Sequence, residues 1–306
     1  MIWRRMLSLI LLISFCFVST AYAGTWVDDG IYIFDEGEES SVFMMTQEDI
    51  RREHVLEDHT YRASKHTFNY IVYRPSGTRP LENLPLIVVM HGSGEVGNDI
   101  KKLKRRPPWI QLNKGTCLPR AIILMPQLPS GSWGKAASDL KSLIDHVADT
   151  YHCDYGRISI TGHSLGGSGV FDVLLKYPDY FAAAASLSPC SNFKGKLSPI
   201  AHIPIWVLHG EKESTYGQYS REIRDQIESY GGICRLTSVA GEGHPIQHCW
   251  CDVEYGLFDW LASYSTQNIA IYDSEPYFGD DGIEIEFSSD DNYVMFDEPI
   301  DVEYTE

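Results

Sequence analysis

The chain has 306 residues, is 43% hydrophobic and carries a formal net charge of −17 at pH 7. This acidic balance argues against nucleic acid or an anionic membrane surface as a partner. The length is sufficient to bury one large core, so a single α/β domain with additions at its ends is expected rather than two equal domains.

The N-terminus has the pattern of a cleaved secretory signal. Arg4 and Arg5 precede an apolar run from Leu7 to Val18, and the small residues Ala21 and Ala23 follow. The run is shorter than the roughly 20 apolar residues that a spanning helix needs. We therefore expect cleavage after Ala23, a secreted or periplasmic protein, and no stable membrane insertion. Loss of the two arginines lowers the net charge from −17 to −19.

The composition suggests four segments: a signal peptide at 1–23, an acidic N-terminal extension at 24–66, a catalytic domain at 67–265 and an acidic tail at 266–306. The extension is weakly periodic and fits an extra strand pair or a loose arm. The tail lacks Lys and Arg, which is typical of solvated segments.

Two short runs inside the tail leave a second interpretation open. The stretches 283–287 and 293–296 fit the two strands of a hairpin with one apolar face. A calcium site among Asp280, Asp281, Asp290 and Asp291 lacks the ligand spacing of a recognised loop.

Short apolar segments alternate with helix-length segments from Thr67 onward, which indicates a mainly parallel, doubly wound sheet covered by helices on both faces. The expected strands are Phe68 to Tyr73, Leu86 to Met90, Ala121 to Met125, Arg157 to Thr161, Phe181 to Ser186, Ile205 to His209 and Cys234 to Val239. The expected helices are Ala137 to Tyr151, Ser168 to Tyr177, Tyr219 to Tyr230 and Val253 to Tyr264. Several strands are continuous Val, Ile, Leu and Ala runs, as buried parallel strands are.

The segment from Gly162 to Gly167 fits the G-x-S-x-G nucleophile elbow, with Ser164 as the nucleophile. A strand precedes this segment and a helix follows it, which is the context that the motif requires. Gly162 and Gly166 leave room for a tight strand-to-helix turn. An ordinary glycine-rich turn is the less favoured interpretation.

A serine hydroxyl needs a base, and the base needs a carboxylate to orient it. His244 follows the last expected strand, and Glu213 or, less favoured, Glu211 follows the strand before it. The order Ser164, Glu213, His244 agrees with the order of nucleophile, acid and base in α/β-hydrolases. A solvated loop charge is the ordinary alternative for Glu213.

A tetrahedral intermediate also needs amide donors for its oxyanion. The backbone N–H of Leu165, directly after the nucleophile, is one candidate. Ser93, in the loop that follows Leu86 to Met90, is the other, with Gly94 next.

Six cysteines follow the signal: Cys117, Cys153, Cys190, Cys234, Cys249 and Cys251. An even number in an exported protein favours disulfide bonds, although their connectivity is open. A metal clip of Cys249 and Cys251 with His244 and His248 is less favoured, because no second ligand pair stands at zinc spacing.

These motifs together resemble the α/β-hydrolases, and more narrowly the secreted carboxylesterases related to dienelactone hydrolases, polyhydroxyalkanoate depolymerases and feruloyl esterases. The resemblance covers about Thr67 to Ser263 and rests on His91 to Asp99, Met125 to Gln127, Arg157 to Gly167 and the loops at His209 and His244. Two departures are Glu213, where most relatives carry Asp, and Ser168, where relatives often carry an aromatic residue.

The resemblance implies ester hydrolysis through an acyl-enzyme, without a metal or organic cofactor, on a small-molecule or polysaccharide-linked ester. Trp109, Trp133, Cys190 with Asn192, Tyr216 and Trp250 are expected on loops near the site, where aromatic side chains suit an apolar or sugar-bearing ester; packing within the loops is the equal alternative. One alternative is a serine peptidase of the prolyl-oligopeptidase type, although the segment before Thr67 is too short for a gating domain. The other is a catalytically silent binding protein with the same fold.

Overall fold

The computed structural model describes residues 25–27, 31–33, 54–75 and 83–266. The expected signal peptide and the acidic tail, with its hairpin and calcium alternatives, lie outside the described residues. Contacts divide the chain after Ile269, and every described element belongs to the first unit. β1 (Thr25–Val27) and β2 (Ile31–Ile33) form an antiparallel pair of their own.

The main sheet has eight strands in the order β10-β9-β8-β7-β5-β6-β4-β3. In chain order they are β3 (Val55–Arg62), β4 (Thr67–Arg74), β5 (Leu86–Met90), β6 (Ile122–Gln127), β7 (Ile158–His163), β8 (Ala184–Leu187), β9 (Ile205–Gly210) and β10 (Cys234–Val239). The six strands β5 to β10 run parallel to one another. β3 and β4 add an antiparallel edge beside β6.

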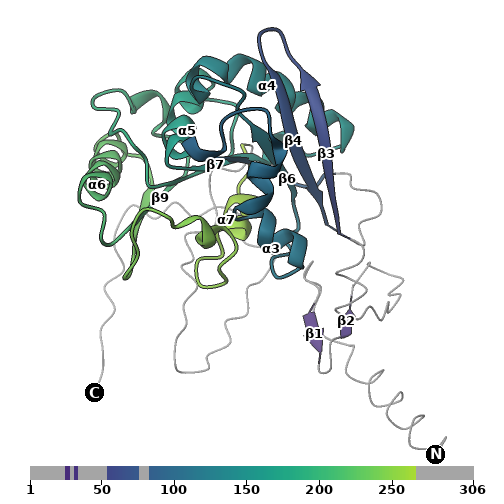
Figure 1. Cartoon of the computed structure of the whole chain (residues 1–306). Coiled ribbons are helices and arrows are strands. Elements are labelled where there is room, and N and C mark those ends of the chain that lie inside the picture. Colours follow the sequence, from purple (N-terminus) through teal and green to yellow (C-terminus); the bar gives the residue numbers. More distant parts are fainter. Residues whose placement is uncertain (1–24, 28–30, 34–53, 76–82, 267–306) are drawn as a thin grey trace, which may run out of the picture. The chain divides into compact units, whose positions relative to one another are not determined.

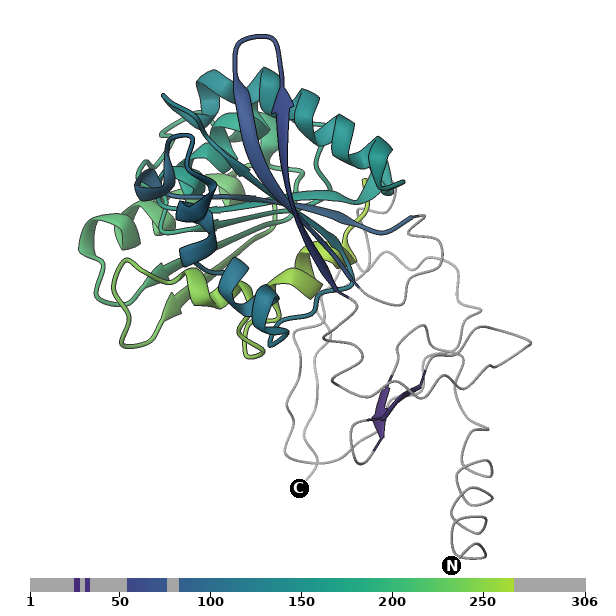
Figure 2. The ribbon, with the colours of Figure 1, turned by 45° about the vertical axis from the view of Figure 1, so that its right-hand side comes forward.

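Helices cover both faces of this sheet (Figures 1 and 2). The α-helices are α3 (Trp109–Lys114), α4 (Trp133–Thr150), α5 (Leu165–Lys176), α6 (Ser214–Ser229) and α7 (Leu257–Ser263). The described 3₁₀ helices are η1 (Ser93–Glu95), η2 (Ile100–Arg105), η3 (Tyr155–Arg157), η4 (Ser198–Ile200) and η5 (Gln247–Trp250).

Alternation along the strands divides the apolar side chains between two cores. In β5, Leu86, Val88 and Met90 pack with α4, α5 and α6, whereas Ile87 and Val89 pack with α3 and α7. All five residues are buried, because a parallel strand covered on both faces has no side open to water. The expected α/β-hydrolase fold is confirmed.

The strand arrangement places the functional loops at one edge of the sheet. β5 and β7 are neighbours, with Met90 opposite Gly162, and β9 pairs with β10 through His209 and Ser238. Because these strands are parallel, the loops that leave them all begin at the same edge. The candidate serine, acid and histidine stand in three of these loops.

The N-terminal side of the sheet extends further than the expected segments suggest. β3 pairs along its whole length with β4, from Val55 opposite Arg74 to Arg62 opposite Thr67. The sheet therefore begins at Val55, inside the acidic segment 24–66 for which an extra strand pair or a loose arm was expected. Among the described residues, no helix is both long and apolar enough to cross a membrane.

We predict that Gly166→Ala lowers the free energy of unfolding by at least about 3 kcal/mol. A Cβ at Gly166 would lie 2.2 Å from the carbonyl oxygen of Met90, which belongs to the sheet backbone and has no freedom to retreat. Gly94→Ala is the matched control, because nothing lies within 4 Å of its added Cβ. Urea unfolding followed by circular dichroism measures both variants, and equal midpoints would contradict the prediction.

Candidate active site

Ser164 stands at the turn between β7 and α5 in a strained conformation. Its φ of 57° and ψ of −115° lie outside the regions that a serine usually adopts. Its N–H donates to the carbonyl oxygen of Leu187 at 2.8 Å, which ties the turn to β8. A Cβ at Gly162 would lie 2.5 Å from backbone atoms of Gly166, so the turn has no room for larger residues. This is the geometry of a nucleophile elbow.

His244 bridges the serine and a carboxylate. Its Nε2 lies 2.9 Å from Ser164 Oγ, and its Nδ1 lies 2.6 Å from Glu213 Oε1. Ser164 follows β7, Glu213 precedes α6 after β9, and His244 follows β10. The structure thus brings the three predicted side chains into one hydrogen-bonded chain.

Glu213 is held by contacts to both carboxylate oxygens. Its Oε2 accepts hydrogen bonds from the backbone N–H of Gly210 at 2.8 Å and from Ser188 Oγ at 2.6 Å. The side chain is only 5% exposed, so these donors and the imidazole replace the water that a buried carboxylate loses. Ser188 was not singled out in the sequence, although it directly follows the strand β8.

Glu211, the other candidate acid, is exposed and turns away from the imidazole. Its Oε2 accepts a hydrogen bond from the N–H of Gly241 at 2.7 Å. The structure therefore places Glu213, not Glu211, beside His244.

The two predicted oxyanion donors stand in adjacent loops. Leu165 is the first residue of α5, where an N–H has no acceptor within the helix. Ser93 is exposed and opens the turn η1 after β5. Both loops leave neighbouring strands, and Gly92 packs against His163.

His163 connects the nucleophile loop to the base. Its Nε2–H donates to the carbonyl oxygen of His244 at 2.7 Å, and the two rings lie 4.7 Å apart. Burial lowers the pKa of His163 to about 4, so the ring is neutral at pH 7. The sequence offers no sign of this role beyond the position directly before the serine.

His91 fixes the loop that carries Ser93. Its Nδ1–H donates to the carbonyl oxygen of Gly92 at 2.6 Å, and its Nε2 accepts from the N–H of Leu128 at 2.9 Å. Burial lowers the pKa of His91 to about 4, so its approach to Glu95 is not an ion pair at pH 7. His91 is therefore a neutral residue that supports the loop.

Trp133 is not on the surface of the site, contrary to expectation. It begins α4, is fully buried, and donates from Nε1 to the carbonyl oxygen of His91 at 3.2 Å. Its ring fills the space left by Gly169, where an added Cβ would lie 2.7 Å from the ring atoms Cγ and Cδ1. Trp133 thus belongs to the core and supports the His91 loop from beneath.

Other expected residues do lie beside the serine. Cys190 is exposed, with Sγ 3.5 Å from Ser164 Oγ. The ring of Tyr216 lies 4.9 Å from that of His244. Asn192, two residues beyond Cys190, is hydrogen-bonded to Glu222 on α6 instead of contacting the serine.

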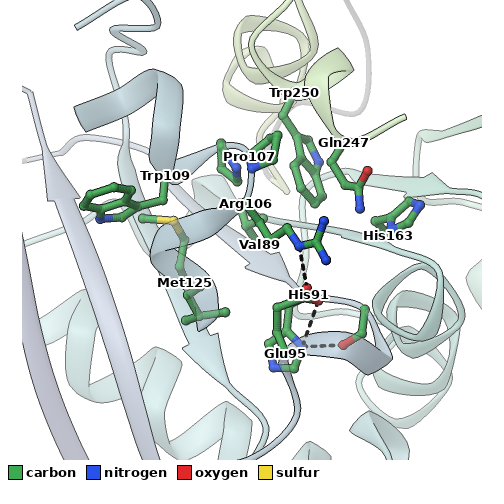
Figure 3. A pocket seen from close by; sticks show the side chains of 13 residues that line it. Val89, His91, Glu95, Arg106, Pro107, Trp109, Met125, His163, Gln247 and Trp250 are labelled. Atoms are coloured by element: carbon green, nitrogen blue, oxygen red, sulfur yellow. Dashed lines mark hydrogen bonds and ion pairs between the residues drawn. The ribbon is translucent and has the colours of Figure 1, made fainter. Parts of the chain in front are cut away.

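A pocket opens next to His91, Gly92 and His163 (Figure 3). Its space is about 390 Å³, part of it open to solvent. Apolar lining comes from Val89, Leu103, Pro107, Pro108, Trp109, Met125 and Trp250, and polar lining from Glu95, Arg106 and Gln247. Trp109 and Trp250 are thus placed where aromatic residues were expected. Arg106 and Gln247 were not anticipated.

The structure does not support the expected disulfide bonds. All six cysteines in the described part of the chain are free thiols. Burial raises the pKa of Cys153, Cys234 and Cys249 to about 12, which keeps these thiols protonated. Among the described residues, no group of three or more Cys, His, Asp or Glu side chains is arranged to hold a metal ion.

Comparisons with known proteins agree with this architecture. Residues 135–233, which include Ser164 and Glu213, match the family described as "Putative esterase". No curated protein matches the sequence.

Three solved structures illustrate the similarity of fold. A thermostable esterase is 24% identical, with a TM-score of 0.54; the match covers 71% of this chain and 64% of the esterase, less than two thirds of its length. The feruloyl esterase module from Clostridium thermocellum, an S954A mutant complexed with sinapinate, is 17% identical over 80% of this chain and 96% of the module, with a TM-score of 0.52. A "putative dipeptidyl aminopeptidase IV" from Bacteroides ovatus is 14% identical over 78% of this chain and 40% of that protein, with a TM-score of 0.53.

The family match supports ester hydrolysis, and the structural matches support the fold. The chain has the α/β-hydrolase fold, and its residues 135–233 match the model of the esterase family.

Proposed function

We propose that this protein is a secreted serine carboxylesterase that cleaves its substrate through an acyl-enzyme. The observation that carries the proposal is the hydrogen-bonded chain from Ser164 Oγ to His244 at 2.9 Å and from His244 to Glu213 at 2.6 Å. The family match of residues 135–233 supports ester hydrolysis as the reaction class. The leader-like N-terminus supports export.

The first half of the reaction forms the acyl-enzyme. His244 Nε2 takes the proton of Ser164 Oγ as the oxygen attacks the ester carbonyl carbon. Glu213 holds Nδ1–H and stabilises the imidazolium that results. The backbone N–H groups of Leu165 and Ser93 receive the negative charge that develops on the carbonyl oxygen.

The first half ends when the imidazolium returns its proton to the departing alcohol and the carbonyl re-forms as an ester of Ser164, the acyl-enzyme. The second half releases the acid. Water then attacks this ester while His244 accepts its proton; the imidazolium returns that proton to Ser164 Oγ as the bond between the serine oxygen and the acyl carbon breaks, and the carboxylic acid leaves. His244 carries every proton that moves between Ser164, the alcohol and water, and the backbone N–H groups stabilise the oxyanion without transferring a proton.

Turnover by the wild-type protein tests the proposed reaction class. We expect hydrolysis of 4-nitrophenyl acetate and butyrate, and no measurable hydrolysis of dipeptidyl 4-nitroanilides, because an amine is a poorer leaving group than a phenolate. Faster cleavage of the anilides would favour the peptidase alternative. Absence of turnover on a broad ester panel by folded protein would favour the silent binding protein.

A further inference from the structure

The pocket beside His163 has a charge pattern that the proposed chemistry does not use. Among the described residues that line it, Glu95 and Arg106 carry charges, since His91 and His163 are neutral at pH 7. Arg106 Nε donates to Glu95 Oε1 at 3.1 Å. The Glu95 side chain is only 10% exposed, so it holds the arginine from the protein side.

The guanidinium of Arg106 presents its free end to the pocket. Figure 3 shows Nε directed at Glu95 and the terminal nitrogens projecting toward the side chains of Gln247 and His163. The arginine is more than half exposed, whereas Glu95 lies behind it. The two terminal nitrogens of an arginine form a fork that matches the two oxygens of a carboxylate.

The segment around Arg106 is basic in an otherwise acidic protein. Residues 101–106 read Lys-Lys-Leu-Lys-Arg-Arg. Lys104 pairs with Asp58, and Lys102 Nζ donates to the carbonyl oxygen of Val96 at 2.8 Å. Lys101 and Arg105 are exposed. The protein as a whole, with a net charge of −17, repels anions. The positive charges of residues 101–106 reduce this repulsion at the pocket.

We propose that this pocket is a subsite for a carboxylate carried by the ester substrate, with Arg106 as the residue that determines this specificity. The inference rests on the proposed esterase function and names its substrate class. The carboxylate of Glu95 already offsets the positive charge of Arg106. The Arg106–Glu95 pair therefore favours a ligand with one negative charge over a dianion such as phosphate, which the Glu95 carboxylate would repel more strongly. The apolar walls, Trp109, Met125 and Trp250 among them, contact the carbon skeleton that joins the carboxylate to the ester.

Two pairs of substrates test the subsite, each pair differing in one group. Monomethyl terephthalate against methyl 4-carbamoylbenzoate places the carboxylate or its neutral amide isostere on the acid side of the ester. 4-Acetoxybenzoate against 4-acetoxybenzamide places it on the alcohol side. The wild-type protein is expected to show a kcat/KM about tenfold higher for the carboxylate in one of the two pairs. That pair identifies the side of the ester that enters the pocket.

Arg106→Gln should remove this preference, so that the two members of the pair react equally fast. Arg105→Gln, which removes the same charge one residue away and outside the pocket lining, should keep it. Equal kcat/KM values within both pairs for the wild-type protein would overturn the proposal. So would a preference that survives Arg106→Gln or is lost equally in Arg105→Gln.

A binding measurement separates failure of the subsite from failure of the proposed function. Calorimetric titration of Ser164→Ala with each member of the pairs requires no turnover. We expect a Kd about tenfold lower for one carboxylate than for its amide, and loss of this difference when Arg106→Gln is added. Equal affinities would overturn the subsite even in an active esterase, whereas absent turnover of 4-nitrophenyl acetate with preserved selective binding would overturn only the esterase.

Discussion

Ser164→Ala is expected to abolish covalent labelling by a fluorophosphonate and to lower kcat/KM for 4-nitrophenyl acetate by at least about 10⁴-fold. The methyl group that remains has no oxygen to attack the carbonyl carbon, and His244 Nε2 loses the proton donor that lies 2.9 Å away. Intact-mass spectrometry after incubation with the reagent measures the labelling, and a nitrophenolate assay measures the turnover.

Ser191→Ala provides the control, because this hydroxyl stands one residue beyond Cys190 and accepts a weak bond from the N–H of Phe193 instead of taking part in the triad. It should be labelled like the wild type. Labelling of Ser164→Ala to the same extent would show that another residue is the nucleophile and would remove the serine esterase proposal.

Glu213→Gln is expected to lower kcat by about 10² to 10⁴-fold, whereas Glu211→Gln should change it by less than about threefold. An amide at position 213 presents an N–H to Nδ1 of His244, which favours the tautomer with its proton on Nε2. That tautomer has no lone pair with which to accept the proton of Ser164. Glu211 instead binds the N–H of Gly241 at the surface, and its charge does not reach the imidazole.

Steady-state kinetics of both variants, with circular dichroism to verify folding, decide between the two acids. Glu213 also accepts bonds from Gly210 and Ser188, and the remaining amide oxygen of glutamine preserves part of this contact. Equal losses in the two variants would mean that neither carboxylate is specific to the imidazole, and the assignment of the acid would be wrong.

The parallel strands and the elbow were predictable because their signals are local. A buried strand such as Leu86–Met90 is an unbroken apolar run, and its observed bounds agree with the expected ones. The elbow needs only small residues at Gly162 and Gly166 around a serine, together with a strand before it and a helix after it.

The elements that the sequence did not reveal depend on contacts between distant segments. β3 contains charged residues such as Glu57 and Asp58 and reads as polar, yet its backbone completes the edge of the sheet against β4. Trp133 appeared to be a loop residue, because nothing near it in the chain shows that Gly169 leaves a space for its ring.

In the functional site too, some features follow from the order of the strands and others depend on contacts that the sequence does not show. The order of strands places Ser164, Glu213 and His244 at one edge, but the choice of Glu213 over Glu211 depends on side-chain direction within a single loop. Arg106 escaped notice because a basic segment usually lies in solvent, and only the fold places this one against the buried Glu95.

The hydrogen bond between His163 and the backbone of His244 limits how far the serine and the histidine can move apart during thermal motion. Since the donor ring belongs to the residue just before Ser164, the segments that carry hydroxyl and imidazole are fastened together independently of their own 2.9 Å contact. Because of this bond, the two segments move together, and the distance between Ser164 Oγ and His244 Nε2 changes little when either segment moves. Proton transfer between them then requires little rearrangement at the moment a substrate arrives.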